Sequence, residues 1–192
     1  MCIRDRLSAV VDGLFAALAA RSLASIAVIN NAAVAGPVGT FGILAPGEIA
    51  DALTVNLVAP AIIANAFVRV FRGLPGDRRL INVSSGAASS PIAGAGVYNV
   101  AKAGLEMLTR ALAAELGPSG LRAITVRPGV IDTPMQSYIR SQPAQRMPSL
   151  AMFQGFHDSG LLVPPDVTAS KIVDRLVVAS IENGRTYEYA QL

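Results

Sequence analysis

The sequence is poor in the residues that form disulfides and metal sites. It holds one cysteine, one histidine and no tryptophan among 192 residues. Cys2 cannot form an internal disulfide, and no His and Cys residues have the spacing of a metal site, so we expect no metal and a reducing, cytoplasmic setting. His157 stands alone, and a lone histidine is more often an ordinary surface or core residue than a ligand.

Charge is also scarce. Charged residues make up 15% of the chain and the formal net charge is +3. Two lysines and 14 arginines are spread singly rather than in a stripe, so we expect no nucleic-acid partner. Hydrophobic residues make up 52% and the mean hydropathy is +0.48, which excludes a disordered chain and fits one globular domain, residues 1–192.

Long uninterrupted hydrophobic runs are missing as well. The longest uncharged stretch, residues 22–47, is broken by glycine, proline and asparagine, so we predict no membrane span and no membrane partner. Residues 1–6 lack the apolar segment of a secretory signal. The high hydropathy instead fits strands that are covered on both faces of a parallel sheet.

What the sequence does contain is an alternation of helical and strand patterns. Helices are expected over residues 7–20, 46–72, 95–116 and 166–179, strands over 25–29, 79–85, 121–126 and 185–190, and a loop-rich stretch over 130–164. This order predicts an α/β fold, a Rossmann-like doubly wound parallel sheet. Ligands bind outside the carboxyl ends of such strands. The residues that follow them, Asn30-Asn31, Ser84-Ser85 and Pro128-Gly129, should line one edge.

Tyr98 and Lys102 lie four residues apart on a predicted helix, so their side chains project from one face. A neighbouring ammonium lowers the pKa of a phenol, which would suit Tyr98 to general acid–base chemistry. An amphipathic surface pair would show the same spacing. Ser85 ends the preceding strand, where its hydroxyl could bind a carbonyl oxygen, although a turn or N-cap serine is the commoner role.

Together with these three residues, several short motifs resemble the short-chain dehydrogenase/reductase family in order and spacing, from about Leu7 to the C-terminus. The motifs are Asn30-Asn31-Ala32-Ala33, Asn56, Ser85, Tyr98-Asn99-Val100-Ala101-Lys102 and Arg127-Pro128-Gly129-Val130-Ile131-Asp132-Thr133. The segments 36–39, 161–165 and 187–189 look most like the benzil reductase and sepiapterin reductase branch.

The resemblance implies hydride transfer between NADP(H) and a small-molecule carbonyl substrate, reducing a ketone or aromatic dicarbonyl to an alcohol. Tyr98 would give a proton to the carbonyl oxygen, and Ser85 would hold that oxygen. Lys102 would lower the pKa of Tyr98 and bind the nicotinamide ribose. Asn56 would position a water that relays protons towards Lys102, although a buried asparagine could also serve a helix kink.

The resemblance also implies a cofactor site and an assembly. Asn30 and Ala32 would border the adenosine half of the cofactor. Pro128, Gly129 and Ile131 would pass the nicotinamide, and Thr133 would reach its amide or phosphate region. The Met- and Phe-bearing residues after position 134 would form a flexible lid over an apolar substrate, or ordinary core. The long helices would pair subunits into a homo-oligomer, a dimer or tetramer.

Two departures from the family pattern stand out. Ala33 replaces a glycine, which would cost about 1 kcal/mol if the position needs a positive φ. The family's first βαβαβ segment with its glycine-rich turn has no counterpart, so we expect a truncated chain with a foreign leader over residues 1–6. The choice between NAD and NADP is then invisible.

Without that segment the chain alone should be poorly soluble and inactive, with the strand at 25–29 an exposed apolar edge. A non-catalytic Rossmann-like interaction module or an inactive fragment is the alternative to an enzyme, and the joint presence of Asn56, Ser85, Tyr98 and Lys102 argues against it.

Overall fold

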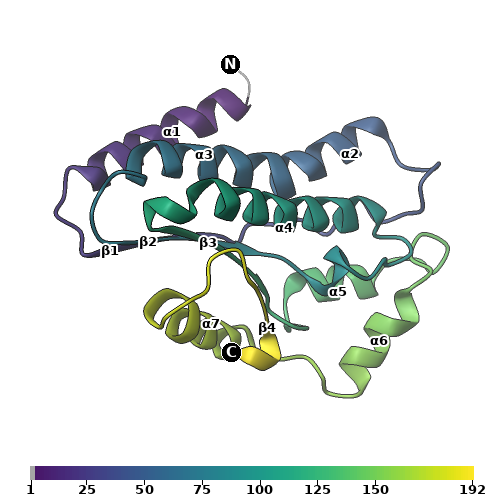
Figure 1. Ribbon diagram of the computed structural model, residues 1–192. Coiled ribbons are helices and arrows are strands. Elements are labelled where there is room, and N and C mark those ends of the chain that lie inside the picture. The colour runs from purple at the N-terminus through teal and green to yellow at the C-terminus, as the bar shows by residue number, and fades with distance from the viewer. Residues whose placement is uncertain (1–2) are drawn as a thin grey trace.

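Four parallel strands form the centre of the computed structural model, which describes residues 3–192 (Figure 1). They are β1 (Ser25–Asn30), β2 (Asp77–Val83), β3 (Leu121–Arg127) and β4 (Thr186–Glu188), and they lie in the order β1-β2-β3-β4. Every neighbouring pair is parallel. The expected Rossmann-like parallel sheet is therefore confirmed.

Helices cover both faces of this sheet (Figure 1). One face carries α1 (Ile3–Ala19), α3 (Ala59–Phe71) and α4 (Gly96–Leu116), and the other carries α7 (Pro165–Ile172). Side chains alternate between the two layers, because Leu80 packs with the α1–α3–α4 cluster whereas Ile81 packs with the α7 cluster. Such two-sided burial explains why the strands read as continuous apolar runs.

The long helix expected over 46–72 is a continuous run of three segments. These are α2 (Pro46–Leu53), a π-helical turn η1 (Thr54–Val58) and α3 (Ala59–Phe71). The run from Pro46 to Phe71 is long and apolar enough to cross a membrane by length and composition alone, with a mean hydropathy of 1.6. One face of it is core, since Phe67 and Phe71 pack in the same cluster as Phe15 of α1. The absence of a membrane span stays a prediction.

The expected loop-rich stretch over 130–164 is wrong in part. It contains α5 (Pro134–Arg140) and α6 (Leu150–Asp158). Their apolar side chains form a third cluster, in which Ile139, Met147 and Phe153 are buried against Val38 and Ala95. The methionines and phenylalanines of the expected lid are therefore largely core residues.

The remaining differences lie at element ends. The first helix begins at Ile3, within the stretch taken for a foreign leader, and Cys2 lies outside the described residues. The helix expected over 166–179 continues from α7 into the π-helical turn η4 (Val173–Val178). Short 3-10 turns complete the chain: η2 (Gly86–Ala88), η3 (Gly117–Ser119) and η5 (Tyr189–Gln191). Within residues 3–192, β1 is an edge strand, and Ile29 in it is 40% exposed.

Candidate functional site

A cavity of about 450 Å³ opens at the carboxyl ends of β1, β2 and β3. Ser85, Tyr98 and Lys102 all line it, as their placement after β2 and on α4 predicted. Five of the expected cofactor residues line it too. They are Ala32, Pro128, Gly129, Ile131 and Thr133. Asn30 and Asn56 are not among the lining residues.

Ser85 and Tyr98 line the same cavity. Ser85 follows β2 and caps η2, where its hydroxyl oxygen accepts a hydrogen bond from the Ala87 N–H at 3.2 Å. The Ser85 side chain also lies near enough to Tyr98 to act against the burial that raises the pKa of the phenol. The N-cap role and the functional role are thus compatible, because the capping bond uses the oxygen and leaves the proton of Ser85 to the cavity.

Lys102 lies one turn further along α4. Its Nζ is 5.5 Å from the centroid of the Tyr98 ring and donates a hydrogen bond to the Val83 carbonyl oxygen at 2.7 Å. The residue is only 2% exposed, and this burial lowers the pKa of Lys102 to about 8. An ammonium with that pKa is close to its midpoint in mildly alkaline solution.

The expected lowering of the Tyr98 pKa is not seen. Burial raises the pKa of Tyr98 above its usual value, and the neighbouring Ser85 side chain opposes this only in part. The reason is geometric, since the Lys102 ammonium lies over the ring and bonds to Val83 rather than to the phenol. Tyr98 therefore keeps its proton at neutral pH.

Asn56 is buried in the π-helical turn η1, and its side chain forms two hydrogen bonds to the loop that follows β1. Its carboxamide oxygen accepts from the Val34 N–H at 2.9 Å and its nitrogen donates to the Val34 carbonyl at 2.8 Å. This two-point contact places the Ala32–Ala33 segment at the cavity. The π-turn agrees with the reading of Asn56 as a residue at a helix irregularity, and its water-positioning role stays a prediction.

Asn30 does not reach the cavity, contrary to expectation. Its side chain donates to Asn82 of β2 at 2.8 Å, Asn82 donates to Thr109 of α4, and Thr125 of β3 reaches the same Thr109 hydroxyl. The side chain is turned into the sheet because Asn30, Asn82 and Thr125 occupy one row of the strand register. Asn31, which follows, lines the cavity instead.

The backbone strain expected at Ala33 is absent. No non-glycine residue among those described has a positive φ, so an alanine fits here without the expected cost. Gly129 is different, because its φ is +78° and an added Cβ would lie 3.2 Å from the Cβ of Tyr189. The positive φ and the close approach of Tyr189 both favour glycine in the turn after β3.

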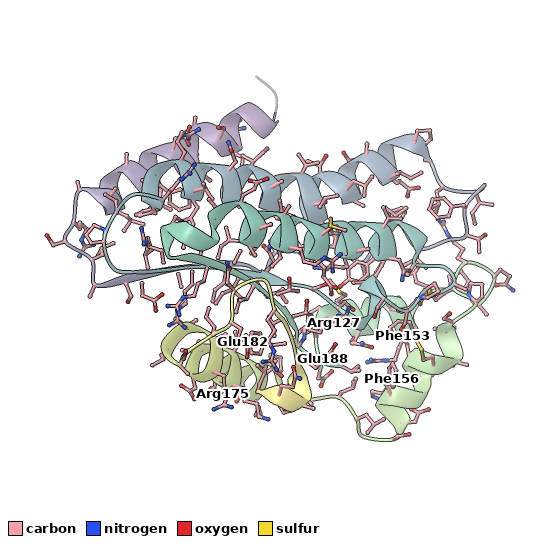
Figure 2. All side chains as sticks on the ribbon, viewed as in Figure 1. Arg127, Phe153, Phe156, Arg175, Glu182 and Glu188 are labelled. Carbon is pink, nitrogen blue, oxygen red and sulfur yellow. The ribbon has the colours of Figure 1, made fainter. Side chains whose placement is uncertain are left out.

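Sequence reasoning missed an ionic clamp beside the site. Glu106, one turn after Lys102 on α4, accepts two hydrogen bonds from Arg127 at 2.7 and 2.9 Å and a third from Ser84 at 2.9 Å. Arg127 also bonds to Glu188 of β4 at 2.8 Å, and Figure 2 shows these two side chains together. The spacing of Tyr98, Lys102 and Glu106 at four-residue steps could have indicated that Glu106 lies on the same face of the helix as the other two.

The Met- and Phe-bearing segment that the sequence places over an apolar substrate forms the outer wall of the cavity, with the helices α5 and α6 in place of the expected loop. Met135, Gln136 and Ile139 of α5, with Met147 and Phe153, line it on that side. Phe153 packs edge-on against Phe156 with ring centroids 6.1 Å apart (Figure 2). This wall is apolar apart from the Gln136 carboxamide. Within residues 3–192, no three His, Cys, Asp or Glu side chains gather as a metal site.

Comparisons with known proteins agree with this geometry. The profile of a family described as enoyl-(acyl carrier protein) reductase matches residues 8–154. Benzil reductase ((S)-benzoin forming) of Bacillus subtilis (strain 168) is 33% identical over 165 residues, covering 85% of this chain and 68% of that protein. Sepiapterin reductase of Meriones unguiculatus is 30% identical over 171 residues, covering 87% and 64%. The chain thus spans about two thirds of these relatives.

Among solved structures, that of the KRED1-Pglu enzyme superposes with a TM-score of 0.82 at 28% sequence identity. The superposition covers 93% of this chain and 75% of that one.

Proposed function

The chain belongs to the short-chain dehydrogenase/reductase family, and from that premise we propose that it forms the catalytic part of an NADP(H)-dependent carbonyl reductase. Its substrate would be a ketone or an aromatic dicarbonyl, reduced to an alcohol. The observation that carries this proposal is the meeting of Ser85, Tyr98 and Lys102 in one largely apolar cavity. The similarity to benzil and sepiapterin reductases supports the substrate class.

The part of the cavity lined by the turns after β1 and β3 would suit the nicotinamide half of such a cofactor. Small residues, Ala32 and Ala33 after β1 and Gly129 after β3, let a flat ring approach the backbone. Among the polar side chains of the cavity, Lys102 would hold the ribose and Thr133 the amide. When bound, the nicotinamide supplies the hydride for the carbonyl carbon.

Tyr98 is the proton donor in this proposal. Its raised pKa keeps the phenol protonated at neutral pH, so it can give that proton to the carbonyl oxygen as negative charge develops. Ser85 donates a hydrogen bond to the same oxygen. The Lys102 ammonium, when charged, stabilises the phenolate that Tyr98 leaves behind.

NADPH consumption in the presence of an aryl diketone tests this function. We propose that the chain alone binds NADPH weakly, and that a form extended at its N-terminus by the first βαβαβ segment of the Bacillus subtilis benzil reductase binds it and turns over. In that form Tyr98→Phe should abolish reduction. Tyr138→Phe is the matched control, because Tyr138 is 45% exposed and lies outside the cavity lining.

Diketone reduction that survives Tyr98→Phe would contradict the role of Tyr98. An extended form that folds yet neither binds NADPH nor reduces any ketone would favour the non-catalytic module. NADPH binding by the short chain itself would show that the described half of the cleft suffices. Homo-oligomer formation is part of the same proposal, supported by exposed Val100 and Met107 on α4.

A further inference from the structure

Two side chains of α4, one helical turn apart, hold the end of β2. Lys102 donates a hydrogen bond to the Val83 carbonyl oxygen at 2.7 Å. Glu106, which lies on the same face of the helix, accepts a hydrogen bond from the Ser84 hydroxyl at 2.9 Å. The next residue along the chain is Ser85, which lines the cavity. The backbone that leads into Ser85 is therefore fastened to the helix that carries Lys102.

Ser84 is held at two points. Its side chain donates to Glu106, and its backbone N–H donates to the Val126 carbonyl oxygen of β3 at 2.8 Å. The residue is buried, so water does not compete for either bond. The place of Ser85 relative to α4 thus depends on the Ser84–Glu106 bond.

Glu106 also holds the turn that follows β3. Its carboxylate accepts from Nε of Arg127 at 2.7 Å and from Nη2 at 2.9 Å. Arg127 is the last residue of β3, and Pro128 and Gly129, which follow it, line the cavity. One buried carboxylate on α4 is therefore shared by the turns after β2 and β3. Hydrogen bonds of this kind are strong because an ionised group takes part in each.

We propose that Glu106 is a positioning residue for the reaction. Through Ser84 it fixes Ser85, and through Arg127 it fixes the turn at Gly129. Glu106 does not line the cavity, so it acts through these neighbours and not by contact with a ligand. The inference rests on the proposed function and adds a source for its alignment. A misplacement of about 1 Å can slow an enzymatic reaction about a hundredfold.

The test uses the form extended at its N-terminus by the first βαβαβ segment of the Bacillus subtilis benzil reductase, so it does not require the chain alone to be soluble or active. The variants are Glu106→Gln, Ser84→Ala and the double variant. NADPH is bound first, and the aryl diketone benzil is then added in excess. The loss of nicotinamide absorbance in a single turnover reports hydride transfer without product release. Fluorescence titration gives the dissociation constant of NADPH.

Two controls separate positioning from a loss of stability. Glu115→Gln removes an exposed carboxylate from the same helix. Leu112→Ala leaves a void in the core cluster that α4 shares with α1 and α3, so it destabilises the fold. Leu112 does not line the catalytic cavity. Rates are compared at a temperature at which circular dichroism shows every variant to be folded.

We expect Ser84→Ala to slow hydride transfer about tenfold and to change the dissociation constant of NADPH by less than about twofold, because only the bond that leads to Ser85 is lost. Glu106→Gln should slow the reaction at least as much and should also weaken NADPH binding, because its bonds to Arg127 weaken too. The double variant should be within about twofold of Glu106→Gln, since both substitutions act on one bond. Both controls should keep the rate and the affinity of the wild type.

Three results would overturn the inference while the proposed function stands. The first is an unchanged rate of hydride transfer in Ser84→Ala, which alone decides the matter if Glu106→Gln does not fold. The second is an equal loss of rate in Leu112→Ala, which would make the effect one of stability. The third is a double variant whose losses add, which would show that Ser84 and Glu106 act separately. An extended wild type that reduces no ketone would refute the proposed function, and the inference with it.

Discussion

The ionic clamp beside the site is open to a direct stability test. Glu106→Gln removes the negative charge that faces Arg127 while it keeps the size and most of the shape of the side chain. In the wild type, Glu106 accepts three hydrogen bonds, two of them from the Arg127 guanidinium. The side chains of Glu106 and Arg127 are only 8% and 17% exposed, so solvent replaces little of what is lost.

The magnitude follows from these contacts. Hydrogen bonds to charged groups are worth about 1.5–3 kcal/mol, and breaking a fully buried pair costs about 3–5 kcal/mol. Arg127 keeps its bond to Glu188, which is half exposed, so the lower range applies. We expect Glu106→Gln to lower the free energy of unfolding by about 2–3 kcal/mol.

Chemical denaturation followed by circular dichroism measures the difference, with Glu115→Gln as the control. Glu115 lies on the same helix but is exposed, and its substitution should change stability by less than about 0.5 kcal/mol. If the two variants lose similar amounts, the clamp contributes no more than a surface charge and our account of it is wrong. A double-mutant cycle with Arg127→Met would then show no coupling.

Three further outcomes are expected from unfolding measurements. Burial lowers the pKa of Lys102 to about 8 in the folded protein, so between about pH 8 and 10 the unfolded chain holds a proton on Lys102 that the folded chain has lost. The free energy of unfolding of the wild type should therefore rise over this range relative to that of Lys102→Met. A stability difference between the two proteins that stays constant with pH would contradict this. Gly94→Ala should lower the free energy of unfolding by about 1–3 kcal/mol, because φ at Gly94 is +91° and the new Cβ would lie 2.7 Å from the Arg146 carbonyl oxygen. Gly155→Ala is the control, because Gly155 has open space around it, and it should not destabilise the protein. Thr109→Val should lower the free energy of unfolding by about 2–4 kcal/mol, because it leaves the buried side chains of Asn82 and Thr125 without their acceptor. A loss near zero would mean that these two side chains find other partners.

The sheet and its helices could be predicted because each strand carries a strong local signal. Leu80 and Ile81 face opposite layers, so β2 reads as a continuous apolar run, and the four-residue spacing of Tyr98 and Lys102 marks one face of α4. Those signals lie within one element, where periodicity can show them. The placement of Ser85 followed from the parallel order of the strands.

Features that depend on contacts between distant segments could not be predicted in this way. The helices α5 and α6 are short, and the prolines at positions 134, 143 and 148 break their pattern, so the segment resembles a loop. Nothing near Arg127 in the sequence points to Glu106, since the two are joined only by packing of α4 on β3. Asn30 looked like a ligand-facing residue because its partner Asn82 lies 52 positions away.

The row of Asn30, Asn82 and Thr125 also determines how the strands can slide. Each strand places one polar side chain in that row, and Asn82 and Thr125 converge on Thr109. A slip of one residue would move a strand by about 3.3 Å and turn its polar side chain to the opposite layer. The same slip would displace Ser85, which follows β2, relative to Tyr98 and Lys102 in the cavity. The alignment of Ser85 with Tyr98 and Lys102 is thus set within the sheet.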